Sequence, residues 1–140
     1  MATLRQEFVV DAAPALVWDV LRDFGAVHTR LAPGFVADCV LEEGGQVRRI
    51  RFANGYEVRE RLVGIDEQAR RLAYTVVGGR AEHHHASAQV LAEPDGRTRF
   101  VWITDVLPDA AAGPIGAMMA VGVPAMQKTL AALGPAAAPA

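Results

Sequence analysis

Apolar and polar residues alternate over positions 4–10, and this pattern predicts a first β-strand. Pro14 then suits the first turn of a helix, and apolar residues recur at helical spacing as far as Phe24. Gly25 ends this pattern, and a second short helical piece is expected before the Ala-Pro-Gly at 32–34. Six further strands are expected between turn-rich clusters, at about 35–42, 46–52, 56–65, 70–77, 82–92 and 97–106.

The last predicted element is a long helix over about 110–133 that ends at Gly134. Its apolar stripe consists of Ile115, Met119, Val123, Met126, Leu130 and Leu133, with Met118 beside it. The order of one strand, two short helices, six strands and a long helix predicts one α+β domain over 1–134. Residues 135–140 read as a flexible tail.

The turn at 53–55 sets the register of the third and fourth strands. A three-residue turn with Gly55 in the left-handed conformation pairs Phe52 with Tyr56 and keeps apolar residues on one face. The same register places Arg48 opposite Glu60 on that apolar face. The next hairpin is expected to add Leu72, Tyr74 and Val76 to it.

The strand at 82–92 carries three consecutive histidines. Its even positions are the more apolar, so His84 is expected to point inward and His83 and His85 outward, unless a bulge reverses them. The neighbouring strand places Thr98, Phe100, Trp102 and Thr104 on one face. Small residues in the histidine strand, Ala86 and Ala88, leave room beside Trp102.

Composition narrows the class of protein. The chain has 140 residues, 51% of them hydrophobic, and a formal net charge of −2, which argues against nucleic acid as a partner. A lone cysteine, Cys39, excludes an internal disulfide and a cysteine-based zinc site. The start of the chain does not resemble a signal peptide, and the alanine-rich helix at 110–133 is too weakly apolar for a membrane span. These features favour a cytoplasmic protein, and the scarcity of lysine is typical of a GC-rich bacterial gene.

Several stretches taken together resemble a known family. They are VWDVLRDF at 17–24, APGF at 32–35, NGYEVRERLVGID at 54–66 and FVWITDV at 100–106. Their order and spacing are similar to those of the SRPBCC superfamily, in particular its small bacterial polyketide cyclase/dehydrase and lipid transport branch. The chain departs from that pattern at Leu31, where many relatives carry tryptophan, and at the histidine-rich 80–85.

The resemblance implies a helix-grip fold, in which a curved seven-stranded antiparallel sheet surrounds the C-terminal helix and a deep apolar cavity. The expected ligand-binding residues are Tyr56, Tyr74, Phe100, Trp102, Met118, Met119 and Met126. Leu130 and Leu133 are expected to fill the core instead. Gly116, Gly122 and Pro124 loosen the first half of the helix, which fits either a gate or a passive kink.

The candidate catalytic residues are His84, Glu60 and Arg48. His84 is the preferred proton carrier, because neutral imidazole titrates near physiological pH. Each also has a purely structural interpretation: Arg48 and Glu60 as an ion pair within the sheet, and His84 as a hydrogen-bonded wall residue. His83 and His85 have the spacing of a metal pair on a strand but lack an obvious third ligand, so neither a metal nor a cofactor is expected.

Two functions from different classes remain open. The first is cofactor-independent cyclisation or dehydration of a polyketide-like or aromatic compound, in which His84 or Glu60 removes a proton next to a carbonyl group. The second is a non-enzymatic carrier for a lipid, quinone or aromatic metabolite. Both predict a small hydrophobic partner, and a homodimer is compatible with either.

Overall fold

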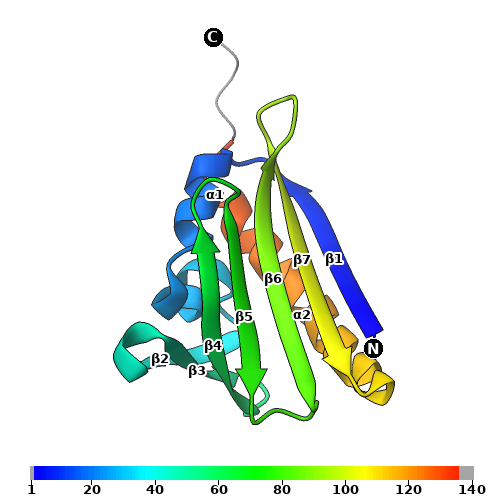
Figure 1. Cartoon of the computed structure of the whole chain (residues 1–140). Coiled ribbons are helices and arrows are strands. Elements are labelled where there is room, and N and C mark those ends of the chain that lie inside the picture. The colour runs from blue at the N-terminus through cyan, green and yellow to red at the C-terminus, as the bar shows by residue number, and fades with distance from the viewer. Residues whose placement is uncertain (1, 136–140) are drawn as a thin grey trace.

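The computed structural model describes residues 2–135 and contains one antiparallel sheet of seven strands (Figure 1). The strands are β1 (Ala2–Val10), β2 (Val36–Glu42), β3 (Val47–Phe52), β4 (Glu57–Asp66), β5 (Arg71–Val77), β6 (His83–Ala92) and β7 (Thr98–Leu107). They lie in the order β1-β7-β6-β5-β4-β3-β2. Consecutive strands from β2 to β7 are therefore neighbours, and β1 is the edge strand beside β7. The predicted fold class, α+β with a helix-grip arrangement, is confirmed.

Two β-bulges help the sheet to curve. The register shifts between Val36 and Asp38 in β2 and between Leu62 and Gly64 in β4. A bulge adds twist and bends its strand. The sheet therefore turns so strongly that β2 and β3 cross the direction of the other strands (Figure 1).

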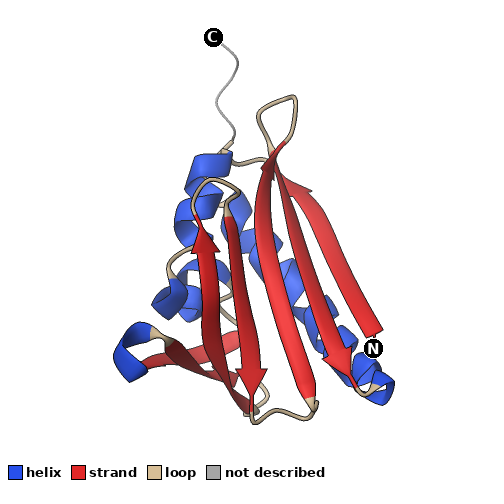
Figure 2. Cartoon of the chain, viewed as in Figure 1, coloured by secondary structure: helices blue, strands red, loops and turns tan. Residues whose placement is uncertain are grey.

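The long helix α2 (Ala112–Ala131) lies across one face of this curved sheet (Figure 2). Its buried residues are Met119, Gly122, Met126 and Leu130, and Gly122 faces the ring of Phe35 in the loop before β2. The expectation that Leu133 fills the core is wrong: the helix ends at Ala131, and Leu133 lies in the turn beyond it with 37% of its surface exposed. The helical periodicity used to place Leu133 no longer applies beyond the last helical residue.

The hairpin between β3 and β4 has the predicted three-residue turn. The amide of Phe52 donates to the carbonyl of Tyr56 at 2.8 Å, and Gly55 has a φ of +88°. The register pairs Arg48 with Glu60, as expected from the alternation of apolar residues. Leu72, Tyr74 and Val76 also lie on this inner face.

The segment after β1 forms the predicted helices in a shortened form. Helix α1 (Pro14–Leu21) begins at its proline, and it is followed by a 3-10 turn at Phe24–Ala26 and a π-helical turn at Val27–Leu31. The indole nitrogen of Trp18 donates to Glu67 at 2.8 Å, which ties α1 to the turn between β4 and β5.

The predicted tail at 135–140 lies outside the described residues except for Pro135. Over residues 2–135, no helix is both long enough and apolar enough to cross a membrane.

Candidate functional site

A cavity of about 110 Å³ lies between the concave face of the sheet and α2. Its wall includes every residue that the sequence singled out for binding or catalysis: Arg48, Tyr56, Glu60, Tyr74, His84, Phe100, Trp102, Met118, Met119 and Met126. Their position on one wall follows from strand alternation and from the helical stripe. Their roles in binding or catalysis stay predictions.

Arg48 and Glu60 form the charged centre of the cavity. The Nε and NH2 nitrogens of Arg48 both lie 2.8 Å from Oε1 of Glu60, and each residue is only 6% exposed. The NH1 nitrogen donates to the carbonyl of Phe24 at 3.1 Å. The guanidinium carbon also lies 4.2 Å from the ring centre of Phe24 and 5.2 Å from that of Tyr74. Arg48 is thus held by several partners, whereas Oε2 of Glu60 takes no part in either Arg48 contact.

Burial alters the acidity of Glu60. Its desolvation raises the pKa of the Glu60 carboxyl above the usual range, and the charge and hydrogen bonds of Arg48 offset part of this rise. A carboxylate with a raised pKa is a stronger base than an exposed glutamate. The interpretation of Glu60 as the structural partner of Arg48 is therefore compatible with its interpretation as a base.

Tyr74 adds a neutral hydrogen-bond donor to this centre. The indole nitrogen of Trp102 donates to the Tyr74 hydroxyl at 3.2 Å. Burial raises the pKa of Tyr74, the nearby Glu60 raises it further, and the phenol stays protonated at neutral pH. Because its oxygen accepts from Trp102, the hydroxyl proton of Tyr74 remains available for a ligand oxygen.

His84 lies on the cavity wall as its strand parity predicted, opposite Val106 in β7. Burial, together with the neighbouring His83 and His85, lowers the pKa of His84 to about 4. The imidazole is therefore neutral at physiological pH and is a weaker base than free histidine. This property makes Glu60 the stronger candidate for removing a proton.

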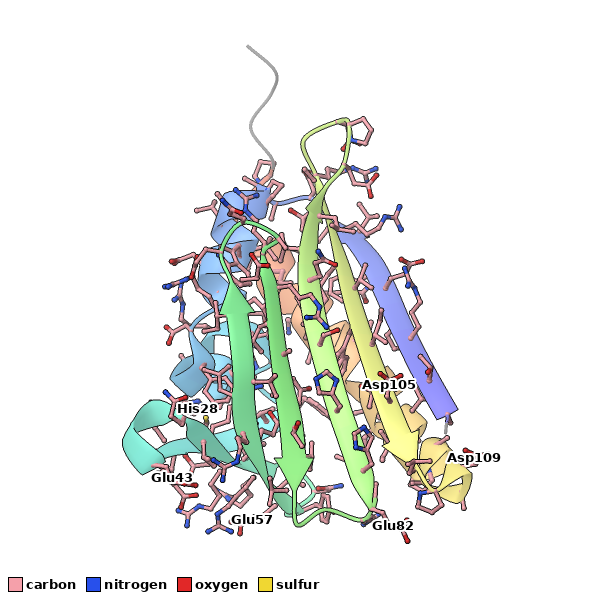
Figure 3. All side chains as sticks on the ribbon, viewed as in Figure 1. His28, Glu43, Glu57, Glu82, Asp105 and Asp109 are labelled. Carbon is pink, nitrogen blue, oxygen red and sulfur yellow. The ribbon has the colours of Figure 1, made fainter. Side chains whose placement is uncertain are left out.

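His83 and His85 alternate with His84 along β6, and His85 lies opposite Asp105 of β7 in the sheet register. Figure 3 shows Asp105 on the side of the sheet that faces away from α2. Among residues 2–135, no three His, Cys, Asp or Glu side chains are grouped so as to hold a metal ion. His28, also labelled in Figure 3, is not part of the cavity wall.

A second hollow of about 280 Å³ adjoins the cavity. It is bounded by the loop after the π-helical turn, the β3–β4 hairpin and the first half of α2, and Phe35, Phe52 and Met118 line both spaces. Phe35 and Phe52 were not among the predicted site residues, although both are large apolar residues next to turns. Their ring centres lie 5.1 Å apart, so they pack as a pair between the two spaces.

Thr104 was also missed. It lines the cavity and is 1% exposed, and its hydroxyl oxygen has no hydrogen-bond partner among the described residues. The available signal was its place on the same face as Phe100 and Trp102. A threonine on an apolar face is unremarkable in a sequence, because its hydroxyl usually finds a backbone partner.

Comparisons with known proteins agree with this geometry. A family model described as polyketide cyclase / dehydrase and lipid transport matches residues 1–137. None of the curated proteins compared with the chain matches it.

Solved structures with the same fold are numerous. A protein from Thermobifida fusca solved by NMR is 31% identical, with a TM-score of 0.77 and 98% of each chain covered. The Zhui aromatase/cyclase from a Streptomyces species is 19% identical, with a TM-score of 0.75, covering 94% of this chain and 92% of its own. Norcoclaurine synthase from Thalictrum flavum is 17% identical, with a TM-score of 0.73, covering 94% of this chain and 85% of its own.

The last two identities are low enough to show the fold alone, whereas the family model covers nearly the whole chain. With its helix-grip sheet, its largely apolar cavity and this match, the chain belongs to the polyketide cyclase/dehydrase and lipid transport family, within the SRPBCC superfamily.

Proposed function

We propose that the protein binds a small hydrophobic, polyketide-like or aromatic ligand in its cavity and converts it by cofactor-independent acid–base chemistry. The reaction class is cyclisation or dehydration through an enolate. The observation that carries this proposal is the placement of the buried Arg48–Glu60 pair and the Tyr74 hydroxyl on the wall of an otherwise largely apolar cavity.

Glu60 is the proposed base. Its Oε2 oxygen takes the proton from the carbon next to a ligand carbonyl group, and its raised pKa favours this transfer. The developing negative charge on the carbonyl oxygen is stabilised by the Tyr74 hydroxyl and by the positive charge of Arg48. A cavity with few water molecules strengthens both interactions, because nothing screens them.

The rest of the reaction returns the proton. The enolate carbon attacks a second carbonyl carbon of the same ligand and forms a carbon–carbon bond. The protonated Glu60 then donates to the resulting alkoxide oxygen. Loss of that hydroxyl as water, with removal of a further proton from the neighbouring carbon, completes a dehydration without an oxidant or a cofactor.

The cavity limits the size of the ligand. At about 110 Å³ it is smaller than the sites of drug-sized ligands, which begin at roughly 300 Å³. It suits a compound with about one aromatic ring. Larger ligands require the wall to move, and the unbranched side chains of Met118, Met119 and Met126 are the ones best able to do so.

A carrier function is the second candidate, and two observations favour it. The Nε and NH2 nitrogens of Arg48 already bind Glu60, and His84 with a pKa near 4 is a poor base. A ligand held only by the apolar wall and by Tyr74 would leave the cavity unchanged.

Native mass spectrometry of the purified protein tests both candidates, because it detects any compound that co-purifies. The identified compound is then incubated with wild type, Glu60→Gln and His84→Gln. Conversion by wild type and by His84→Gln, with a loss of two to four powers of ten in Glu60→Gln, is expected of the enzyme. Binding without conversion by any of the three proteins would instead support the carrier.

A further inference from the structure

One buried hydroxyl group on the cavity wall makes no hydrogen bond within the described part of the chain. Thr104 of β7 is 1% exposed and lines the cavity, and its Oγ1 has no hydrogen-bond partner within the described chain. Buried polar groups are almost always paired, and an exception calls for an explanation such as an absent ligand.

A comparison within the same strand shows what a purely structural threonine looks like. Thr98 lies on the same face of β7 and is fully buried, yet its hydroxyl donates to the carbonyl of Ala12 at 2.7 Å. It does not line the cavity. Of these two buried threonines of β7, the one that lines the cavity lacks a partner among the described residues.

His84 lies beside Thr104 in the sheet. The register pairs Thr104 with Ala86 and His84 with Val106, so Thr104 and His84 are diagonal neighbours on the inner face of adjacent strands. Diagonal neighbours are close enough for a long side chain to reach across, and Ala86 is too small to separate them. Within residues 2–135, the imidazole of His84 makes no side-chain hydrogen bond.

The two groups together present complementary hydrogen-bonding capacity without charge. A neutral imidazole has one donor and one acceptor nitrogen, and a threonine hydroxyl donates and accepts. The residues directly opposite Thr104 in the neighbouring strands, Leu4 and Ala86, are apolar, and the indole nitrogen of Trp102, on the same face of β7, already donates to Tyr74. An oxygen with both a proton and lone pairs, as in a phenol or an alcohol, satisfies this pair better than a carboxylate does.

We propose that Thr104 and His84 form a polar subsite that binds a neutral hydroxyl group of the ligand, apart from the Arg48–Glu60–Tyr74 centre. The inference rests on the proposed binding of a hydrophobic ligand in this cavity and narrows its class. The ligand carries a carbonyl group for Tyr74 and Arg48 and a separate hydroxyl group for Thr104 and His84. Thr104 is a specificity residue in this arrangement, and His84 orients the same group.

Binding of 4-methylphenol and toluene tests the subsite, because the two probes share their shape and differ by one hydroxyl group. Affinities are measured from the fluorescence of Trp102 in a Trp18→Phe background, since Trp102 lines the cavity and Trp18 does not. Thr104→Val keeps the side-chain shape and removes the hydroxyl. We expect wild-type cavities to prefer 4-methylphenol, and Thr104→Val to reduce that preference about 3- to 10-fold, the effect of one hydrogen bond.

The controls separate this inference from the proposed function. Thr98→Val is expected to lower the melting temperature and leave the preference unchanged, whereas Thr104→Val is expected to leave the melting temperature unchanged or raise it. His84→Leu should reduce the preference as Thr104→Val does. An unchanged preference in Thr104→Val, with toluene still bound, would overturn the subsite alone. Failure of the wild-type cavity to bind either probe would overturn the proposed function as well.

Discussion

The buried positions of Arg48 and Glu60 are the observations on which the proposed chemistry of the site mainly rests. Both are only 6% exposed on the face that packs against α2, and the Nε and NH2 nitrogens of Arg48 reach the same carboxylate oxygen of Glu60. Taking two charges out of water is costly, and a buried pair is often no more stable than apolar residues of the same size. Stability alone therefore does not account for this pair on the wall of a cavity, and the proposed chemical role of Glu60 is a separate explanation for it.

Removal of one partner of the Arg48–Glu60 pair should reduce the free energy of unfolding much more than removal of both partners. Arg48→Met leaves Glu60 buried without a partner, and we expect it to reduce the free energy of unfolding by about 3–5 kcal/mol. The double variant Arg48→Met/Glu60→Leu should recover most of that loss. Urea denaturation of the two single variants and the double variant measures the coupling. Equal losses in the single and double variants would show that the pair is not buried as described.

His84 provides a pH-dependent prediction. Its pKa is about 4 in the folded protein and near 6.5 in the unfolded chain, so the unfolded chain binds the extra proton first. Stability should therefore fall as the pH drops from 6.5 to 4. We expect a loss of about 1–2 kcal/mol for this residue, because partial exposure screens the cost of the charge.

The measurement is the difference in unfolding free energy between wild type and His84→Gln at pH 7 and pH 4. Use of the difference removes the contribution of Glu60, whose raised pKa acts in the opposite direction over part of this range. A difference that stays constant with pH would mean that His84 titrates normally and faces solvent.

Strand alternation was sufficient to place Glu60, Arg48 and His84 on the inner face, because most of the other residues at the same parity in their strands are apolar. Strand alternation was not sufficient to predict the pKa values or the hydrogen-bond partners of the side chains on that face. The low pKa of His84 and the unpaired hydroxyl of Thr104 both depend on how deeply the neighbouring strands and α2 bury them. The amino-acid sequence alone does not give the depth to which these side chains are buried.

At the scale of elements, α2 packs against the loop before β2, and Phe35 of that loop lies beside Gly122 of the helix. A Cβ atom added to Gly122 would lie 2.8 Å from the ring of Phe35, so only glycine lets that ring rest against the helix. The same ring lines both the cavity and the outer hollow. The sequence indicated that Gly122 loosens the helix, but not that it makes room for an aromatic residue distant in the chain.

Gly122→Ala should therefore displace the Phe35 ring and change the rate of ligand entry. Gly116→Ala is the matched control, since a Cβ there would make only ordinary contact with Leu4 at 3.6 Å and the residue lies in the interior of the same helix. The control should be stabilised by about 0.5–1 kcal/mol through helix propensity alone, whereas Gly122→Ala should gain less or lose stability. Thermal unfolding and stopped-flow binding of toluene to both variants measure the two effects. Identical behaviour of the two variants would show that the Phe35 ring does not limit the rate of ligand entry.

At the scale of the whole molecule, the curved sheet and α2 enclose a space that neither forms alone. The strands from β3 to β7 and the turns that contain Tyr56 and Arg80 contribute the polar groups, and α2 contributes the methionines. The succession of strands and helices along the chain and the seven-stranded antiparallel sheet could be predicted from periodicity and from the resemblance to a family. The size of the space could not, because it depends on the curvature that the bulges in β2 and β4 introduce.

The most direct test of the account is proton removal from carbon inside the cavity, measured without knowledge of the natural ligand. Acetophenone has one aromatic ring, one carbonyl group and exchangeable methyl hydrogens, and its exchange in heavy water is followed by the loss of the methyl proton NMR signal. We expect wild type to exchange these hydrogens faster than buffer alone, and Glu60→Gln to reduce the protein-dependent rate about 100-fold or more. Equal rates in wild type, Glu60→Gln and buffer, with acetophenone bound to the folded proteins, would contradict the assignment of acid–base chemistry to this site.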